Sequence, residues 1–80
     1  MGKKSRAQRF KSAQESVDYA LVQFTILQEE LQDWLDNMPE NLQESAKAEE
    51  IDSVIGDLDG VICDAENIVN VEIEFPRMIG

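Results

Sequence analysis

The residues of this chain with the most chemical character lie in the acidic stretch VIGDLDGVICDAEN, from Val54 to Asn67. Asp57 and Asp59 are two residues apart, they follow an apolar run, and Gly60 comes directly after them. Enzymes use carboxylates as nucleophiles and as general acids or bases. The stretch therefore raises two hypotheses, a pair of catalytic aspartates or the acidic side of a helix.

This D-x-D-G pattern after an apolar run resembles the first motif of the haloacid-dehalogenase phosphatases. The resemblance implies that Asp57 is the phosphate-accepting nucleophile and Asp59 the general acid, after a buried parallel strand. That family also needs a later Ser or Thr, a Lys and magnesium-binding carboxylates, and no Ser, Thr or Lys follows Gly60. The spacing also differs from the D-x-D-x-D-G of a calcium loop. We therefore favour the acidic helix.

A helical pattern runs through the same stretch. Apolar residues recur at alternating intervals of three and four, as in an amphipathic helix. They are Ala48, Ile51, Ile55, Leu58, Ile62, Ala65 and Val69, widened on one side by Val54, Val61 and Ile68. Asp57, Asp59 and Asp64 fall outside this row, so we expect them to face solvent.

The first half of the chain carries a row with the same spacing: Phe10, Ala13, Val17, Ala20, Phe24, Leu27, Leu31, Trp34 and Met38. Ser5 and Gln8 form a capping-box pattern that starts a helix. Pro39 ends it, because the residue before a proline is disfavoured in the helical region. We predict helices at about 5–37 and 45–69, joined by a turn at 38–44, with Asn41 or Ser45 capping the second.

Two amphipathic helices joined by a short loop pack as antiparallel neighbours. The sequence thus predicts an all-α fold, an antiparallel helical hairpin formed by one domain over residues 1–80, with a short extended tail at 70–80. Apolar and polar residues alternate from Val69 to Phe75, before Pro76, as in a strand. We expect the tail to fold back over the first helix; a strand added to a partner's sheet is the alternative.

Charge is divided along the chain. The first eleven residues hold five bases and no acid, whereas the remaining 69 hold two bases and all seventeen acids. The five bases are Lys3, Lys4, Arg6, Arg9 and Lys11. We expect this basic end to pair with acids such as Glu66, Glu72 and Glu74; nucleic-acid binding is the weaker alternative, because aromatic residues do not interleave the bases.

The acidic remainder has two interpretations. It is a solubilising surface, or it mimics nucleic-acid phosphates and binds a basic groove on a partner protein. The candidate partner-binding residues are Glu49, Glu50, Asp52, Asp57, Asp59 and Asp64.

The middle of the first helix, VDYALVQFTIL, is apolar around most of its circumference. Beyond the row above it carries Tyr19, Leu21, Val22 and Ile26. A hairpin covers only one side of such a helix. We expect these four residues to mediate a homodimer; coverage by the tail or by a target protein is the alternative.

The composition argues against catalysis. The chain has no histidine, and its one cysteine, Cys63, forms neither an internal disulfide nor a Cys–His pair. No zinc-ligand spacing or glycine-rich phosphate loop occurs. We expect no enzymatic activity, no cofactor and no metal site. No apolar run approaches the ~20 residues of a membrane span, so we expect a cytoplasmic protein that does not enter membranes.

The segment LQEELQDWLDNMPENLQES, Leu27 to Ser45, and the closing EFPRM resemble a type of small phage-encoded protein with the pattern E-L-x-x-W-x-D-N-[ILM]-P-E-N-L-Q. The matching residues are Glu30, Leu31, Trp34, Asp36, Asn37, Pro39, Glu40, Asn41, Leu42, Gln43, Phe75 and Pro76. The resemblance implies a viral origin and a location in the host cytoplasm. Within the turn we expect Trp34 to form an apolar plug with Met38, Pro39 and Leu42. Its polar residues either cap helix ends or form a binding corner.

Small acidic phage proteins often inhibit a host protein, which leads to a functional hypothesis. We expect a non-enzymatic protein that binds a host defence or nucleic-acid-handling protein through its acidic surface and inhibits it. Two alternatives remain: an accessory phage subunit built into a larger assembly, or a nucleic-acid binder that uses the basic N-terminus.

Overall fold

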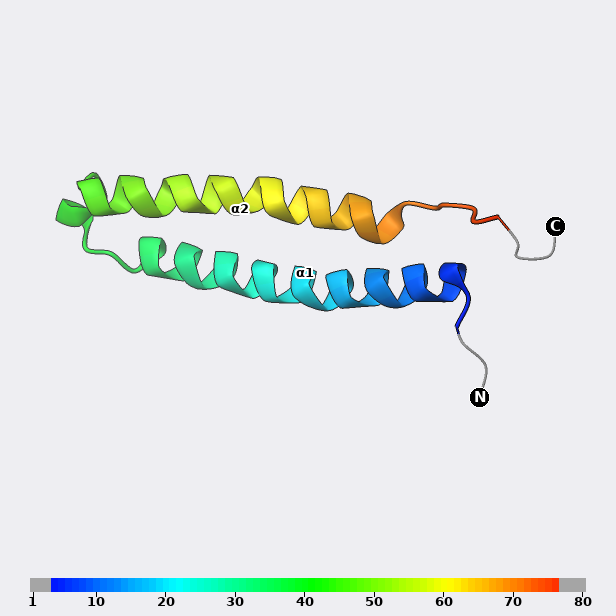
Figure 1. Ribbon diagram of the computed structural model, residues 1–80. Helices are drawn as coiled ribbons and strands as arrows, with labels where there is room; N and C mark the ends of the chain where they lie inside the picture. The colour runs from blue at the N-terminus through cyan, green and yellow to red at the C-terminus, as the bar shows by residue number, and fades with distance from the viewer. Residues whose placement is uncertain (1–3, 77–80) are drawn as a thin grey trace.

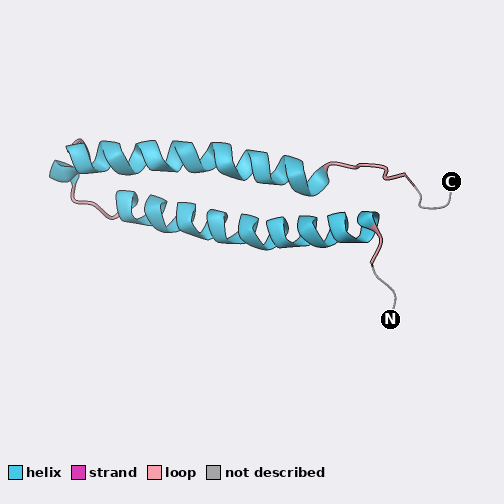
Figure 2. Ribbon diagram, viewed as in Figure 1, coloured by secondary structure: helices cyan, strands magenta, loops and turns pink. Residues whose placement is uncertain are grey.

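The computed structural model describes residues 4–76 and shows two long helices side by side, running in opposite directions (Figure 1). Helix α1 spans Arg6–Asp36, a 3₁₀ turn spans Glu40–Leu42, and α2 spans Ala46–Asn70. The predicted all-α antiparallel hairpin is confirmed, and both helices begin and end within one residue of the predicted bounds. Residues 71–76 are extended, and no strand forms within residues 4–76 (Figure 2).

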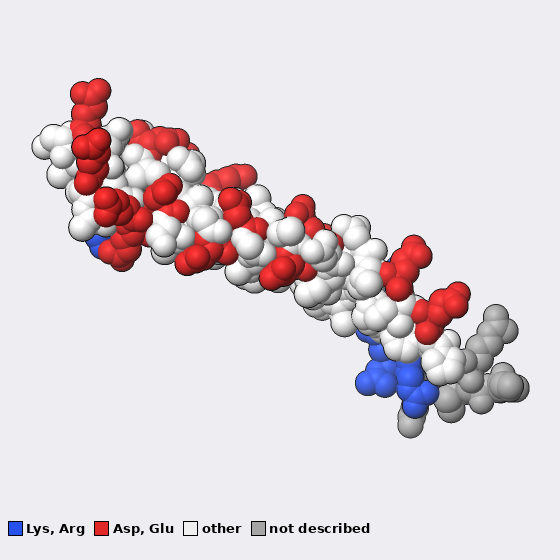
Figure 3. Space-filling view, turned by 90° about the horizontal axis from the view of Figure 1, so that it is seen from above, with Lys and Arg blue, Asp and Glu red and all other residues white. Residues whose placement is uncertain are grey.

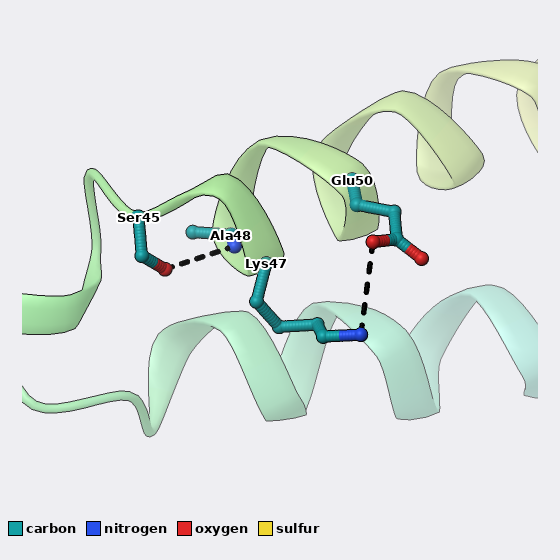
Figure 4. Close-up of polar contacts among 4 residues, drawn as sticks. All are labelled: Ser45, Lys47, Ala48 and Glu50. Atoms are coloured by element: carbon teal, nitrogen blue, oxygen red, sulfur yellow. Dashed lines mark hydrogen bonds and ion pairs between the residues drawn. The ribbon is translucent and has the colours of Figure 1, made fainter.

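Both helices begin at a serine cap. The Ser5 Oγ accepts a hydrogen bond from the Gln8 N–H at 3.1 Å, and the Gln8 Oε1 accepts one from the Ser5 N–H at 2.9 Å, which completes the predicted capping box. The Ser45 Oγ accepts from the Ala48 N–H at 3.2 Å (Figure 4). These bonds satisfy backbone donors that have no partner within the first helical turn.

The turn closes through polar side chains. The Asn37 side chain donates to the Asp33 carbonyl at 2.8 Å, and the Gln43 side chain donates to the Met38 carbonyl at 3.2 Å. Both residues therefore hold backbone groups of the turn. The expected apolar plug is not closed, since the Trp34 and Leu42 side chains remain about half exposed, at 51% and 46%.

The contact between the helices uses a row of α1 that shares five of its nine members with the predicted one and differs in the other four. The side chains of this row, the seam of α1, are partly buried and again recur at intervals of three and four. They are Phe10, Gln14, Val17, Leu21, Phe24, Gln28, Leu31, Leu35 and Met38. The expected members Leu27 and Trp34 are half exposed instead.

Two glutamines occupy this seam because their amides bond across to α2. The Gln28 Nε2 donates to the Ile55 carbonyl at 3.1 Å and to the Asp59 Oδ1 at 2.7 Å. The Gln14 Nε2 donates to the Ile68 carbonyl at 2.9 Å and to the Val71 carbonyl at 2.8 Å. A polar residue at a core position fixes the alignment of paired helices at a cost in stability. These four bonds therefore set the register of the two helices, that is, which turn of α1 lies beside which turn of α2.

On α2 the predicted row does face α1. Ala48, Ile51 and Ala65 are buried and the other four members are partly buried. Among the residues of α1, all of which the structure describes, none is buried. The radius of gyration is 19.2 Å, against the ~12 Å of a compact chain of this length. The core is thus one thin layer of side chains between two helices.

The described part of the tail lies along the beginning of α1. The rings of Phe75 and Phe10 are in contact, with centroids 5.5 Å apart, and the Val71 carbonyl accepts from Gln14. The tail covers the beginning of α1 as expected as far as Pro76, but it does so by continuing in the direction of α2 and not by folding back (Figure 1). Residues 77–80 lie outside the described residues. Within residues 4–76, neither Arg9 nor Lys11 forms the expected ion pair with Glu66, Glu72 or Glu74; Lys3 lies outside them.

Candidate functional site: an acidic face

All seventeen acidic side chains lie within residues 4–76, and every one of them is exposed. Acidic side chains extend over almost the whole length of the molecule, and a basic cluster lies at one end (Figure 3). Glu50 forms an ion pair with Lys47 at 3.6 Å (Figure 4). The hairpin thus presents a large excess of negative charge to solvent.

The seam divides this charge between two faces of the hairpin. Gln14 of α1 and Ala48 of α2 are equivalent seam positions, and each repeats every seven residues along its helix. On each helix, one flank lies four residues after these positions, and the other flank lies one residue before them. Because the helices run antiparallel, equivalent flanks of α1 and α2 lie on the same face of the pair. The chemistry of each face can therefore be derived from the register.

The first flank is acidic on α2, whereas on α1 it holds one acid, Asp18, with Lys11, Thr25 and Gln32. Together with the carboxylates that follow the same seam positions by one residue, these acids form what we call the acidic face. Its members are Glu15, Asp18, Glu29 and Asp36 of α1 and Glu49, Asp52, Asp59 and Glu66 of α2. Open depressions along the groove between the helices bring these carboxylates together. From the turn towards the chain ends, they are lined by Asp36, Glu49 and Asp52, by Glu29 and Asp59, and by Glu15 and Asp18 with Lys11.

The second flank forms an apolar face. Its members are Ala13, Ala20, Leu27 and Trp34 of α1 and Val54, Val61 and Ile68 of α2, with Lys47 at its turn end. The five large apolar side chains among them are 41–51% exposed. The two faces thus lie on opposite sides of one seam.

The structure separates the six acidic residues expected to bind a partner. Glu49, Asp52 and Asp59 belong to the acidic face, and the Asp59 carboxylate is held by Gln28. The other three, Glu50, Asp57 and Asp64, lie on the opposite side of α2, along the edge of the apolar face. Glu15 and Asp18 were not among the residues expected to bind a partner. They lie one and four residues after Gln14, and this spacing identifies them only once Gln14 is known to lie in the seam.

The four residues expected to mediate self-association are also separated. Leu21 is partly buried in the seam, seven residues from both Gln14 and Gln28, so it faces α2 and not a second molecule. Tyr19 and Ile26 are 70% and 41% exposed and lie on the side of α1 away from α2, whereas Val22, 51% exposed, lies midway between Glu15 and Glu29 along the acidic face. The apolar face was not expected as a separate surface.

The two aspartates of the phosphatase-like motif do not form a common site. Asp57 and Asp59 lie within α2, on its two opposite flanks, because residues two apart on a helix do not share a face. Within residues 4–76, no three His, Cys, Asp or Glu side chains are placed to hold a metal ion. Over the same residues, no helix has the length and apolarity needed to cross a membrane. Cys63 is exposed.

Fold and surface together define an elongated, coiled-coil-like hairpin with one acidic and one apolar face. Comparison with protein-family models, with curated proteins and with solved structures finds no match. The chemistry of the two faces is therefore the basis for functional inference.

Proposed function

We propose that this protein acts without catalysis, by binding a protein partner through its acidic face. The observation that carries the proposal is the convergence of eight exposed carboxylates from both helices on one side of a rod. A face with one sign of charge recruits a partner of the opposite charge and raises the rate of encounter. The partner surface would be rich in Lys and Arg.

The spacing of the charges favours a partner that normally holds nucleic acid. From Glu15 to Asp36 the acidic face spans ~32 Å at 1.5 Å per residue, so its eight carboxylates give about one charge per 4 Å. Duplex DNA carries about one charge per 1.7 Å of axis, and each of its strands about one per 3.4 Å. The acidic face therefore approximates the charge density of one strand, and a basic groove that accommodates one strand fits it.

In line with the resemblance of the turn segment to phage-encoded proteins, we place the partner in a host cell. It would be a defence or nucleic-acid-handling protein of the host cytoplasm, and occupation of its basic groove would inhibit it.

A pair of matched variants of α2 tests the proposal. One removes three charges from the acidic face, Asp52→Asn, Asp59→Asn and Glu66→Gln. The other removes three charges from the opposite flank, Glu50→Gln, Asp57→Asn and Asp64→Asn. Wild type and both variants are used as bait in host lysate, and the affinity of each captured protein is then measured with and without a competing single-stranded oligonucleotide.

We expect the acidic-face variant to lose the partner while the opposite-flank variant retains it. We also expect the oligonucleotide and raised salt to displace the wild type, because both compete with charge–charge contacts. Equal affinity of the acidic-face variant and wild type would refute binding through this face. A partner that the oligonucleotide does not displace would refute nucleic-acid mimicry.

A further inference from the structure

A continuous apolar surface crosses from one helix to the other on the apolar face. Leu27 precedes Gln28, whose amide bonds to Ile55 and Asp59, so Leu27 lies level with the stretch between Val54 and Val61. The same register places Trp34 between Lys47 and Val54, and Ala20 between Val61 and Ile68. Side chains from α1 and α2 therefore alternate along one face of the rod.

We propose that this apolar face is the interface of a homodimer, in which the second copy is inverted end for end and the two hairpins form a four-helix bundle. The exposed area supports this occupant. The chain exposes 6713 Å², whereas a compact monomer of 9.1 kDa exposes ~4,900 Å². This excess of about 1,800 Å² is spread over the whole rod, and it is large enough to include the ~800 Å² that each partner buries in a standard interface.

Charge selects the inverted arrangement. Residues 29–52, around the turn, hold nine acids and one base, whereas the other end, residues 4–14 with residues 68–76 beside them, holds four bases and two acids. Copies aligned in the same direction would bring the two turn ends together and repel. Inversion places the basic end of each copy beside the acidic turn end of the other, and the two-fold symmetry makes both contacts equivalent.

The dimer does not depend on the function proposed above. The acidic face lies on the opposite side of the seam, so dimerisation leaves both copies of it exposed. The interface differs from the one expected from the sequence, since it uses Leu27, Trp34, Val54, Val61 and Ile68 in place of Tyr19, Leu21, Val22 and Ile26.

Two valine substitutions test the interface. Val61 and Val22 are 42% and 51% exposed, but only Val61 belongs to the apolar face. In sedimentation equilibrium, the wild type should have twice the mass of one 9.1 kDa chain. Val61→Glu should raise the dimer dissociation constant at least about tenfold, because it buries an unpaired charge, and Val22→Glu should leave it unchanged.

A monomeric wild type, or an equal effect of the two substitutions, would overturn the interface. Circular dichroism shows whether Val61→Glu still folds. If it does not fold, Ile68→Ala is measured in its place, and we expect it to weaken dimerisation. An unchanged dissociation constant in Ile68→Ala would contradict the proposal. Trp34, the only tryptophan, gives a further measurement: its emission should move to shorter wavelength as the wild type is concentrated.

The orientation is tested with a spin label at the turn, on Asn41→Cys in a Cys63→Ser background. In the inverted dimer the two labels should be about 45 Å apart, close to the length of α1. A separation within about 20 Å, the width of two helices, would show parallel copies and overturn the charge argument.

Discussion

The two broad faces of this hairpin differ in chemistry although they flank the same seam. One presents eight carboxylates, and the other presents five large apolar side chains that are 41–51% exposed. Neither face is covered by the chain's own helices. The difference teaches that folding and binding use different heptad positions here: the seam joins the helices, and each flank is available to a separate partner.

This comparison predicts where substitutions act. Changes in the seam should reduce the stability of the hairpin itself. Changes on a flank should leave the hairpin folded and alter only association with the partner of that face. Four substitutions of decreasing effect test this separation.

The largest effect is expected from Ile51→Ala. Ile51 is 3% exposed and packs in the seam of α2, so truncation should lower the free energy of unfolding by about 2–5 kcal/mol. Urea unfolding followed by circular dichroism at one protein concentration measures this. The control is Asp52→Ala, one residue further on the acidic face, which should change stability by less than about 0.5 kcal/mol. A comparable loss in the control would mean that the acidic face also holds the fold.

A smaller loss is expected from Gln28→Ala. The substitution removes both bonds of the Gln28 amide to α2, and at about 0.5–1.5 kcal/mol per bond it should cost about 1–3 kcal/mol in total. Gln32→Ala is the matched control, because its amide bonds only within α1, to Asp36, and it should cost less. If both substitutions have the same effect in urea unfolding, the cross-helix bonds do not set the register.

These glutamines explain how far the fold could be predicted. The helices, their serine caps and the turn depend on local signals, namely heptad spacing, Ser5 with Gln8, and Pro39, and these were legible in the sequence. The choice of seam on α1 was not. A pattern of side-chain polarity favours the row with Leu27 and Trp34 over the row with Gln14 and Gln28. The structure uses the second row because carbonyls of α2 satisfy the two amides, which is a property of the pair of helices.

The candidate site was predictable to the same degree. The excess of acids was evident from composition alone. Their division into two flanks depends on the seam register, which was predicted correctly on α2 but not on α1, so Glu15 and Asp18 could not be assigned to the acidic face beforehand. Leu21 was misplaced for the same reason, because its position seven residues from Gln14 and Gln28 mattered more than its apolar neighbours.

Gly56→Ala should raise stability by about 0.8–1 kcal/mol, because glycine is unfavourable within a helix and a Cβ at this position meets no atom within 4 Å. Gly60→Ala should behave alike for the same reason. Urea unfolding measures the gain, and capture of the partner should not change. Gly56 lies one heptad after Glu49, on the acidic side of α2. A gain in stability with loss of the partner would therefore show that the partner packs closely against the helix backbone on this side.

The smallest effect is expected from Lys47→Ala. The Lys47–Glu50 ion pair is 3.6 Å long and its side chains are 57% and 68% exposed, so its loss should cost less than about 0.5 kcal/mol in urea unfolding. Lys47 lies one heptad before Val54, on the apolar side, so its removal adds to the negative charge of the molecule without altering the acidic face. Partner affinity should therefore stay the same in Lys47→Ala and in the control Lys47→Arg. Loss of Lys47 could instead raise the affinity for the partner by as much as loss of one acidic-face charge lowers it. The partner would then respond to the total charge of the molecule, and the distinction between the two faces would not govern binding.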